Sequence, residues 1–461
     1  YFLESQGRID RIGLLAGYSS ERGRDDFPFH LQKASPPNAT PRRANSDFQR
    51  RQVYLHGNLA TDDRSAITFS AQHVLADRGV SGSILFPTDV ARQNDKDVSL
   101  LVGYLDSHLS GVELNIRSGF HHNLETYVDP TFLINSYYKN IFVNLNPQIQ
   151  WLISKNERLI IGGELGRGLL YGNDFDGRVS RVQKSIYASN EVQFDFDRAY
   201  LDRVSLYQTL RYDDISDVDH ALVPKFGVNL RLFKEGDVRL RASVGRNFRA
   251  PSFNDMYYRG FSNPNLKPER STSFDVGVLA GSEYFGEHTM EFTYFHLNTE
   301  NRILFDPTTY LPVNIGKARS AGIEAKYQGR FLKRMIDVGV NYTLADARKT
   351  NRNSDNDPSF DKQLLYIPKD VVAITFSVLL DPLTLNVTHS LVGRRYIKED
   401  NSESLPPYHL THANIVLSAP IGSRKLFAKA EVNNLFDRDY EVFQYYPMPK
   451  RSYRVTLGVE Y

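Results

Sequence analysis

The stretch Ser452–Tyr461 reads SYRVTLGVEY and alternates large apolar residues with polar or small ones. Its apolar residues are Tyr453, Val455, Leu457, Val459 and Tyr461. A period of two places the apolar and polar sets on opposite faces of a β-strand. An amphipathic, aromatic-tipped strand at the carboxyl end of a chain is typical of an outer-membrane β-barrel.

The same alternation recurs along the chain and predicts further strands. Examples are Val53–Leu59, Leu159–Leu165, Phe226–Leu232, Ile323–Tyr327 and Ile336–Leu344. In a soluble sandwich the polar face would meet water, whereas in a membrane barrel it would line the lumen. Alternation alone leaves both architectures open.

The lengths of the connections favour the barrel. Nine short turns are predicted near 62–64, 107–111, 154–157, 197–200, 234–237, 281–286, 329–333, 381–382 and 421–424. Ten longer polar segments alternate with them, at 20–45, 77–89, 122–131, 172–179, 213–220, 248–270, 300–311, 347–361, 394–407 and 437–450. Tight turns at one rim and long loops at the other are typical of outer-membrane barrels. The sequence therefore predicts an all-β, transmembrane, antiparallel up-and-down β-barrel of about twenty strands.

Composition narrows the function classes. The 461 residues hold 56 basic and 54 acidic side chains, so there is no basic footprint for a nucleic-acid partner. No cysteine is present, which excludes disulfides, a thiol nucleophile and a thiolate metal site. The most apolar run, Val371–Leu380, is about half the roughly 18 residues needed for a spanning helix. No motif indicates a cofactor.

Several motifs resemble those of TonB-dependent outer-membrane receptors, especially the cobalamin and siderophore receptors. Within Asn247–Ser271, FRAPSFND is followed by NPNLKPERS. NIGKARSAGIEAKY (Asn314–Tyr327), NYTLADAR (Asn341–Arg348) and NNLFDRDYE (Asn433–Glu441) follow in the order of the family, and ADRGVSGS (Ala76–Ser83) precedes them. Together these pieces span most of the chain.

The resemblance implies a 22-stranded barrel with a plug domain folded inside it. Residues 1–461 would then be the barrel domain alone, with the plug and most of the first hairpin absent. Tyr1–Gly7 would be the remnant of the second strand, and the next strand is expected near Ile9–Ser20. The implied partners are the plug, the energy-transducing TonB complex through that plug, a small-molecule chelate and the lipid of a Gram-negative outer membrane.

Two carboxylates are expected to face the lumen. In Thr272–Val278 the outward set is Phe274, Val276 and Val278, which turns Asp275 inward. By the same alternation Glu324 points inward. The resemblance implies that these two residues hold arginines of the plug, while solvated charges in a wet lumen are the alternative.

Substrate contacts are expected from aromatic and arginine side chains of the external loops, which offer rigid contact area. The candidates are Phe253, Tyr257, Tyr258, Arg259, Tyr310, Tyr396, Tyr445 and Tyr446. Packing within the loops is the alternative interpretation for each of them.

Metal binding and catalysis have weaker support. Asp174 and Asp176 in NDFDG have a spacing compatible with calcium, although an ordinary Asp/Gly turn fits the same sequence. Adjacent strand residues point to opposite faces, so His121 and His122 make a poor chelating pair. The chain contains no G-x-S-x-G motif. The functional alternatives are thus a receptor wall for a scarce chelate, a passive porin-type channel and, with least support, a membrane-embedded hydrolase.

Overall fold

We describe the protein from a computed structural model. The structure describes residues 1–29, 41–233, 237–306, 309, 311–352, 354–422 and 424–460. One antiparallel sheet of 21 strands forms the wall. Its first strands are β1 Phe2–Ile9, β2 Ile12–Gly23, β3 Phe48–Ala60, β4 Ser65–Gly79, β5 Arg92–Asp106, β6 Val112–Asp129, β7 Ile134–Ser154, β8 Glu157–Gly172, β9 Val179–Arg198 and β10 Leu201–Ile215. The sheet continues with β11 Ala221–Leu232, β12 Asp237–Arg249, β13 Glu269–Ser282, β14 Glu287–Glu300, β17 Lys317–Phe331, β18 Ile336–Lys349, β19 Asp370–Leu380, β20 Leu383–Val392, β23 Tyr408–Ile421, β24 Arg424–Asn433 and β27 Ser452–Glu460.

Each wall strand pairs with the next wall strand along the chain, which confirms the all-β, up-and-down prediction. The register also confirms the two faces. Val455 and Leu457 of β27 lie opposite Ala430 and Ala428 of β24, and Leu417 of β23 lies opposite Ala428. Because side chains alternate along every strand, this register keeps the apolar sets on one continuous outer face. Tyr461, the last of the predicted apolar set, lies outside the described residues.

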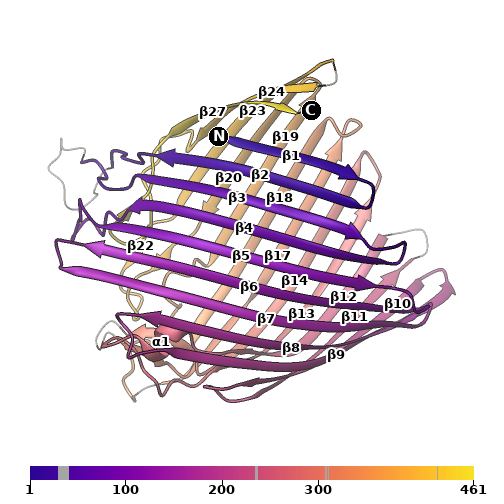
Figure 1. The fold of residues 1–461 in the computed structure, drawn as a ribbon, viewed down its shortest axis with the longest axis horizontal. Coiled ribbons are helices and arrows are strands. Elements are labelled where there is room, and N and C mark those ends of the chain that lie inside the picture. The colour runs from indigo at the N-terminus through magenta and orange to yellow at the C-terminus, as the bar shows by residue number, and fades with distance from the viewer. Residues whose placement is uncertain are drawn as a thin grey trace.

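The connections fall into two groups at opposite ends of the barrel. The long ones gather at the left in Figure 1 and the short ones at the right. The long connections carry α1 Phe253–Tyr257 and the short strands β15 Ile303–Asp306, β16 Leu311–Asn314, β21 Arg395–Tyr396, β22 Ser404–Leu405, β25 Glu441–Phe443 and β26 Tyr446–Pro447. Among the described residues, no helix has the length and apolar character needed to cross a membrane.

One predicted loop is a strand instead. The segment 122–131 was expected to be a long connection, but β6 runs to Asp129 and pairs with β7 down to Asp129 opposite Ile134. Only 130–133 separates the two strands. The polar residues that suggested a loop continue the period-two pattern of a strand.

The strand expected at Tyr1–Gly7 is present as β1 Phe2–Ile9, next to the twenty strands counted from the turns and loops. Phe2–Ile9 pairs along its length with β2, and Asp10 turns the chain with a φ of 51°. The sheet therefore holds 21 strands rather than about twenty.

The two edges of the sheet are β1 and β27. Because every neighbouring pair is antiparallel and the number of strands is odd, both edge strands run in the same direction. They therefore do not form an antiparallel pair with each other. Their ends lie near one another in Figure 1, and an ion pair of 3.7 Å joins Arg454 of β27 to Glu21 of β2 across the seam.

Candidate functional site

The external loops are locked together by contacts between residues far apart in the sequence. The centre of one such cluster is Phe175, in the connection between β8 and β9, whose side chain is only 2% exposed. Its ring makes edge-to-face contacts with Tyr138 at 5.8 Å and Tyr258 at 5.7 Å between centroids. Such aromatic pairs add to the stabilisation gained from burial. One side of the Tyr258 ring is therefore covered by packing against Phe175.

The predicted calcium candidates lie in this cluster, and both carboxylates have protein partners. The Tyr138 hydroxyl donates to Asp174 Oδ2 at 2.8 Å, and Arg259 Nε donates to Asp176 Oδ1 at 2.9 Å. Arg259 also donates its backbone N–H to the Asp174 carbonyl at 2.8 Å. Within the described ranges, no group of three or more acidic or histidine side chains is arranged to hold a metal ion. The sequence NDFDG thus ties one loop to another in this structure, and calcium binding there stays a prediction.

The helix α1 begins at a capping box. Ser252 Oγ accepts from the Asp255 backbone N–H at 3.1 Å, and Asp255 Oδ2 accepts from the Ser252 N–H at 2.9 Å. Pro251, which fits the entry to a helix, is fully buried just before the cap. Phe253 lies against Arg181 of β9, and Tyr257 contacts Asp217 in the connection between β10 and β11.

Arg181 of β9 holds the helix to the wall. Its guanidinium forms two parallel hydrogen bonds with Asp217, at 2.6 and 2.8 Å, and donates to the Pro251 carbonyl at 2.9 Å. It also lies 4.8 Å from the ring centroid of Phe253. The Tyr257 hydroxyl donates to Asp217 Oδ2 at 3.0 Å. Burial, with the nearby Asp217 carboxylate, raises the pKa of Tyr257 above its ordinary value.

A second cluster joins the loops near the carboxyl end. Arg395 of β21 is 3% exposed and donates to the backbone carbonyls of Glu441 at 2.8 Å and Pro406 at 3.2 Å. Its guanidinium lies 4.8 Å from the ring centroid of Tyr408, which in turn packs on Tyr440. Burial lowers the pKa of Arg395 from its ordinary value. The arginine thereby clamps two external hairpins to the wall.

The remaining predicted aromatic residues surround this second cluster. Tyr396 pairs with Ser404 in the β21–β22 hairpin. Tyr445 adopts a positive φ of 69° in the turn between β25 and β26, and Tyr446 has the Arg43 guanidinium 5.8 Å from its ring centroid. Tyr310 lies outside the described residues. The structure thus divides the predicted substrate contacts into two groups and does not bring them together at one point.

A groove of about 380 Å³ lies between the α1 loop and the β15–β16 hairpin. Its lining includes Arg249, Asp255, Tyr258, Phe261 and Pro312. Arg249 is paired with Glu269 at 2.6 Å, whereas the ring of Phe261 is 54% exposed. Of the predicted contacts, Tyr258 lines the groove, while the polar groups of Tyr257 and Arg259 are already used in holding the loops.

The two lumen carboxylates lie on the inward faces of β13 and β17, the two strands that flank β14. Asp275 lies opposite Phe295 of β14, and Glu324 lies opposite Thr293, two residues away on that strand. Ser243 Oγ donates to Asp275 Oδ1 at 2.6 Å. Neither carboxylate forms an ion pair with a described residue.

Sequence reasoning singled out Asp174, Asp176 and Arg259 but assigned them to metal or substrate binding and not to holding the loops. It missed Phe175, Arg181 and Arg395, whose partners lie far away in the sequence. Lys349 is a further example: it is buried, pairs with Asp357 at 2.8 Å and donates to Ser359 Oγ at 2.7 Å. A single charged residue among polar neighbours carries no local signal of burial. The two-residue alternation at the strand end was the only hint that Arg181 points inward.

Known proteins resemble this chain in sequence and in fold. A family model described as TonB dependent receptor-like, beta-barrel, matches residues 3–435. The vitamin B12 transporter BtuB of Photobacterium profundum is 28% identical over 232 residues, which cover 49% of this chain and 36% of that protein. BtuB of Vibrio vulnificus is 26% identical over 235 residues, with 49% and 35% covered. The match thus spans about a third of the length of these relatives.

Solved structures share the fold. The FrpB iron transporter of Neisseria meningitidis (F5-1 variant, apoprotein) superimposes with a TM-score of 0.77 at 14% identity, over 99% of this chain and 78% of that one. The siderophore receptor PirA of Pseudomonas aeruginosa gives a TM-score of 0.72 at 15% identity, over 100% of this chain and 76% of that one. At these identities the likeness concerns the fold of the wall.

Proposed function

Because this chain belongs to the TonB-dependent receptor β-barrel family, we propose that it is the wall of a receptor that imports a scarce chelate, such as a siderophore or a cobalamin. The family consists of transporters of the Gram-negative outer membrane and not of enzymes. Relatives with the sequence match are vitamin B12 transporters, and those with the fold include iron and siderophore receptors. The chemical class of the cargo is therefore a chelate, with the individual compound left to experiment.

The locked external loops carry this proposal. Phe175 and Arg181 fix the α1 segment, and Arg395 fixes the hairpins near the carboxyl end. Fixed loops hold Tyr258 and Phe261 beside the 380 Å³ groove with little conformational freedom to lose on binding. Preorganised aromatic contacts of this kind suit a receptor with high affinity, whereas a passive channel has no need of them.

We assign different tasks to the predicted contact residues. Tyr258 lines the groove and is the candidate for direct contact. Phe253, Tyr257 and Arg259 act as positioning residues, because Arg181, Asp217 and Asp176 already occupy their rings or polar groups. Tyr396, Tyr445 and Tyr446 stay candidates for a contact from the opposite side of the loop assembly.

The proposal includes a plug within the wall. Asp275 and Glu324 present two carboxylates to the lumen, and neither has a cationic partner among the described residues. Carboxylates enclosed by a folded plug need such partners, since an unpaired buried charge is costly. We propose that arginines of the plug supply them. We also propose that one further strand, antiparallel to both β1 and β27, completes a 22-stranded wall.

Binding measurements on the complete receptor test the recognition surface. Affinities for a panel of ferric siderophores and corrinoids would be measured for the unaltered receptor and for Phe261→Ala. Because the Phe261 ring is exposed beside the groove, we expect loss of about tenfold or more in affinity for one compound, with little change in stability.

The matched control is Leu332→Ala, since Leu332 is similarly exposed but lies in the short turn between β17 and β18 at the opposite end of the barrel. Binding should be unchanged in this variant. A receptor that binds none of the compounds, or whose binding depends equally on both positions, would contradict the proposed surface.

A further inference from the structure

The outer face of β12, β13 and β14 changes from apolar to charged at one level. Paired residues on neighbouring strands mark this change, because the register places them in one row across the sheet, and the row slopes with the tilt of the strands. The last mainly apolar row toward the loops is Val244, Phe274 and His296. The next row is Arg246, Thr272 and Asn298, and the row above it is Phe248, Arg270 and Glu300. By alternation with Phe274 and Val276, all of these side chains point to the lipid side.

In an outer-membrane barrel, such a change from apolar to charged side chains is expected at the lipid headgroups. Below it the outward residues of the same strands include Val276, Tyr294 and Phe292, which suit the hydrocarbon core. Arginine is costly in that core but favourable where it reaches the interface. Arg246 and Arg270 therefore lie where phosphate groups of membrane lipids are found.

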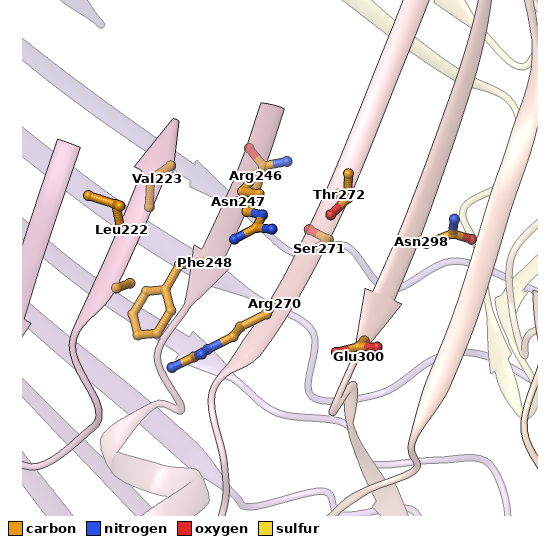
Figure 2. A pocket seen from close by; sticks show the side chains of 11 residues that line it. Leu222, Val223, Arg246, Asn247, Phe248, Arg270, Ser271, Thr272, Asn298 and Glu300 are labelled. Atoms are coloured by element: carbon orange, nitrogen blue, oxygen red, sulfur yellow. The ribbon is translucent and has the colours of Figure 1, made fainter. Parts of the chain in front are cut away.

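A groove of about 480 Å³ runs across the loop ends of β11 to β14 at this level (Figure 2). Its lining includes Leu222, Arg246, Phe248, Arg270 and Glu300. Figure 2 shows the side chains along adjacent strands, with Phe248 and Arg270 opposite each other as the register requires. The groove thus combines apolar and cationic surface.

The positive charge of the groove is only partly neutralised. Arg246 forms no hydrogen bond or ion pair with any described side chain. Arg270 has one hydrogen bond, of 3.3 Å to the His220 carbonyl, and lies 3.8 Å from Asp219. The single carboxylate in the groove, Glu300, pairs with Lys317 at 3.0 Å. An anion entering the groove would meet the unpaired guanidinium of Arg246 and the remaining N–H groups of Arg270, which can form charge-assisted hydrogen bonds.

We propose that this groove binds the phosphate group of an anionic lipid in the outer leaflet. Arg246 and Arg270 would hold the phosphate, which arginine binds with paired hydrogen bonds. The acyl chains would extend over the apolar rows that begin at Val244 and Phe274. Charge complementarity and the height of the groove at the membrane boundary both favour a lipid as the occupant.

The neighbouring strands provide a matched control in the same registered row. Arg319 of β17 lies opposite Asn298, and Arg348 of β18 lies opposite Arg319, so they extend the same outward row. Both are paired with Asp346, at 3.5 and 2.9 Å. Removing these two arginines changes the charge by the same amount, but it does not touch the groove.

The test is native mass spectrometry of the complete receptor in detergent, titrated with bisphosphorylated lipid A and with the same lipid after removal of its phosphates. We expect the phosphorylated lipid to bind more tightly. Each arginine contributes about a fivefold factor, so R246Q/R270Q should lower the affinity by more than tenfold, and R319Q/R348Q by less than twofold. Inorganic phosphate at the same concentration should not displace the lipid.

R246K/R270K keeps both charges but removes the paired hydrogen bonds, so it should bind more weakly than the unaltered receptor and more tightly than R246Q/R270Q. This variant supplies a result if the glutamine variant fails to insert. Equal binding of the two lipids, equal losses in both glutamine variants, unchanged affinity in the lysine variant, or displacement of the lipid by free phosphate would overturn the proposal.

Discussion

Phe175→Ala is the sharpest perturbation of the loop assembly. The substitution removes a ring that is 2% exposed and is gripped edge-to-face by Tyr138 and Tyr258. Replacing a buried phenylalanine by alanine typically costs about 3 kcal/mol or more. We expect the substitution to weaken the docking of the β8–β9 loop on the α1 loop and to leave the free energy of unfolding of the barrel unchanged. Since 1.4 kcal/mol is a factor of ten, loop opening should rise by about a hundredfold.

Amide hydrogen exchange of the complete receptor, resolved by peptide, measures this effect. Protection should fall by about two orders of magnitude in 172–178 and 253–262 and stay unchanged in β6 and β7. Phe261→Ala is the control, because that exposed ring also lies against Tyr258, at 6.1 Å between centroids. If Phe175→Ala left both segments protected, or if the two variants behaved alike, the reasoning about the aromatic lock would be refuted.

Three further predictions test other parts of the account. Leu457→Arg, on the lipid face of β27, should lower the free energy of unfolding in vesicles by about 2–4 kcal/mol, whereas Thr456→Arg, on the lumen face, should change it little; equal effects would contradict the assigned faces. Asp275→Asn with Glu324→Gln should release the plug of the complete receptor at a lower urea concentration, as measured by protease sensitivity, and unchanged plug retention and transport would count against the anchoring role. The pKa of Tyr257 is raised, so its hydrogen bond stabilises the α1 loop fully below about pH 10, and this stabilisation is lost as the pH rises through the higher folded pKa. The difference in tyrosinate absorbance between the unaltered receptor and Tyr257→Phe should show this residue ionising above the ordinary pH for tyrosine. Ionisation at the ordinary pH would argue against the buried contact.

The wall could be predicted from sequence because its rules are local. Alternation in Ser452–Tyr461 identified the lipid face of the last strand, and the register with β24 agrees with it. The alternation of short turns with long loops predicted that the connections would lie at two different ends of the barrel. The turn at Asp10 was not among the predicted turns, because it joins β1 to β2 without a Gly or Pro and instead has an aspartate at positive φ.

The loop assembly could not be predicted, because its contacts are non-local. Arg259 meets Asp176 from 83 residues away, and Arg395 meets Glu441 from 46 residues away. The residues next to each partner in the sequence do not indicate either pairing. Sequence reasoning therefore identified Tyr257 and Arg259 as noteworthy external residues, but the structure indicates that their polar groups hold loops together.

Energy-dependent uptake tests the central claim most directly. Cells lacking their own chelate receptors would express the complete receptor, and uptake of the bound chelate identified above would be compared with and without a functional TonB complex. The account predicts saturable uptake that is abolished when TonB is absent, together with no large stable conductance of the receptor in planar bilayers. Uptake that persists without TonB, or a large open pore, would contradict the receptor-wall assignment and favour a passive channel.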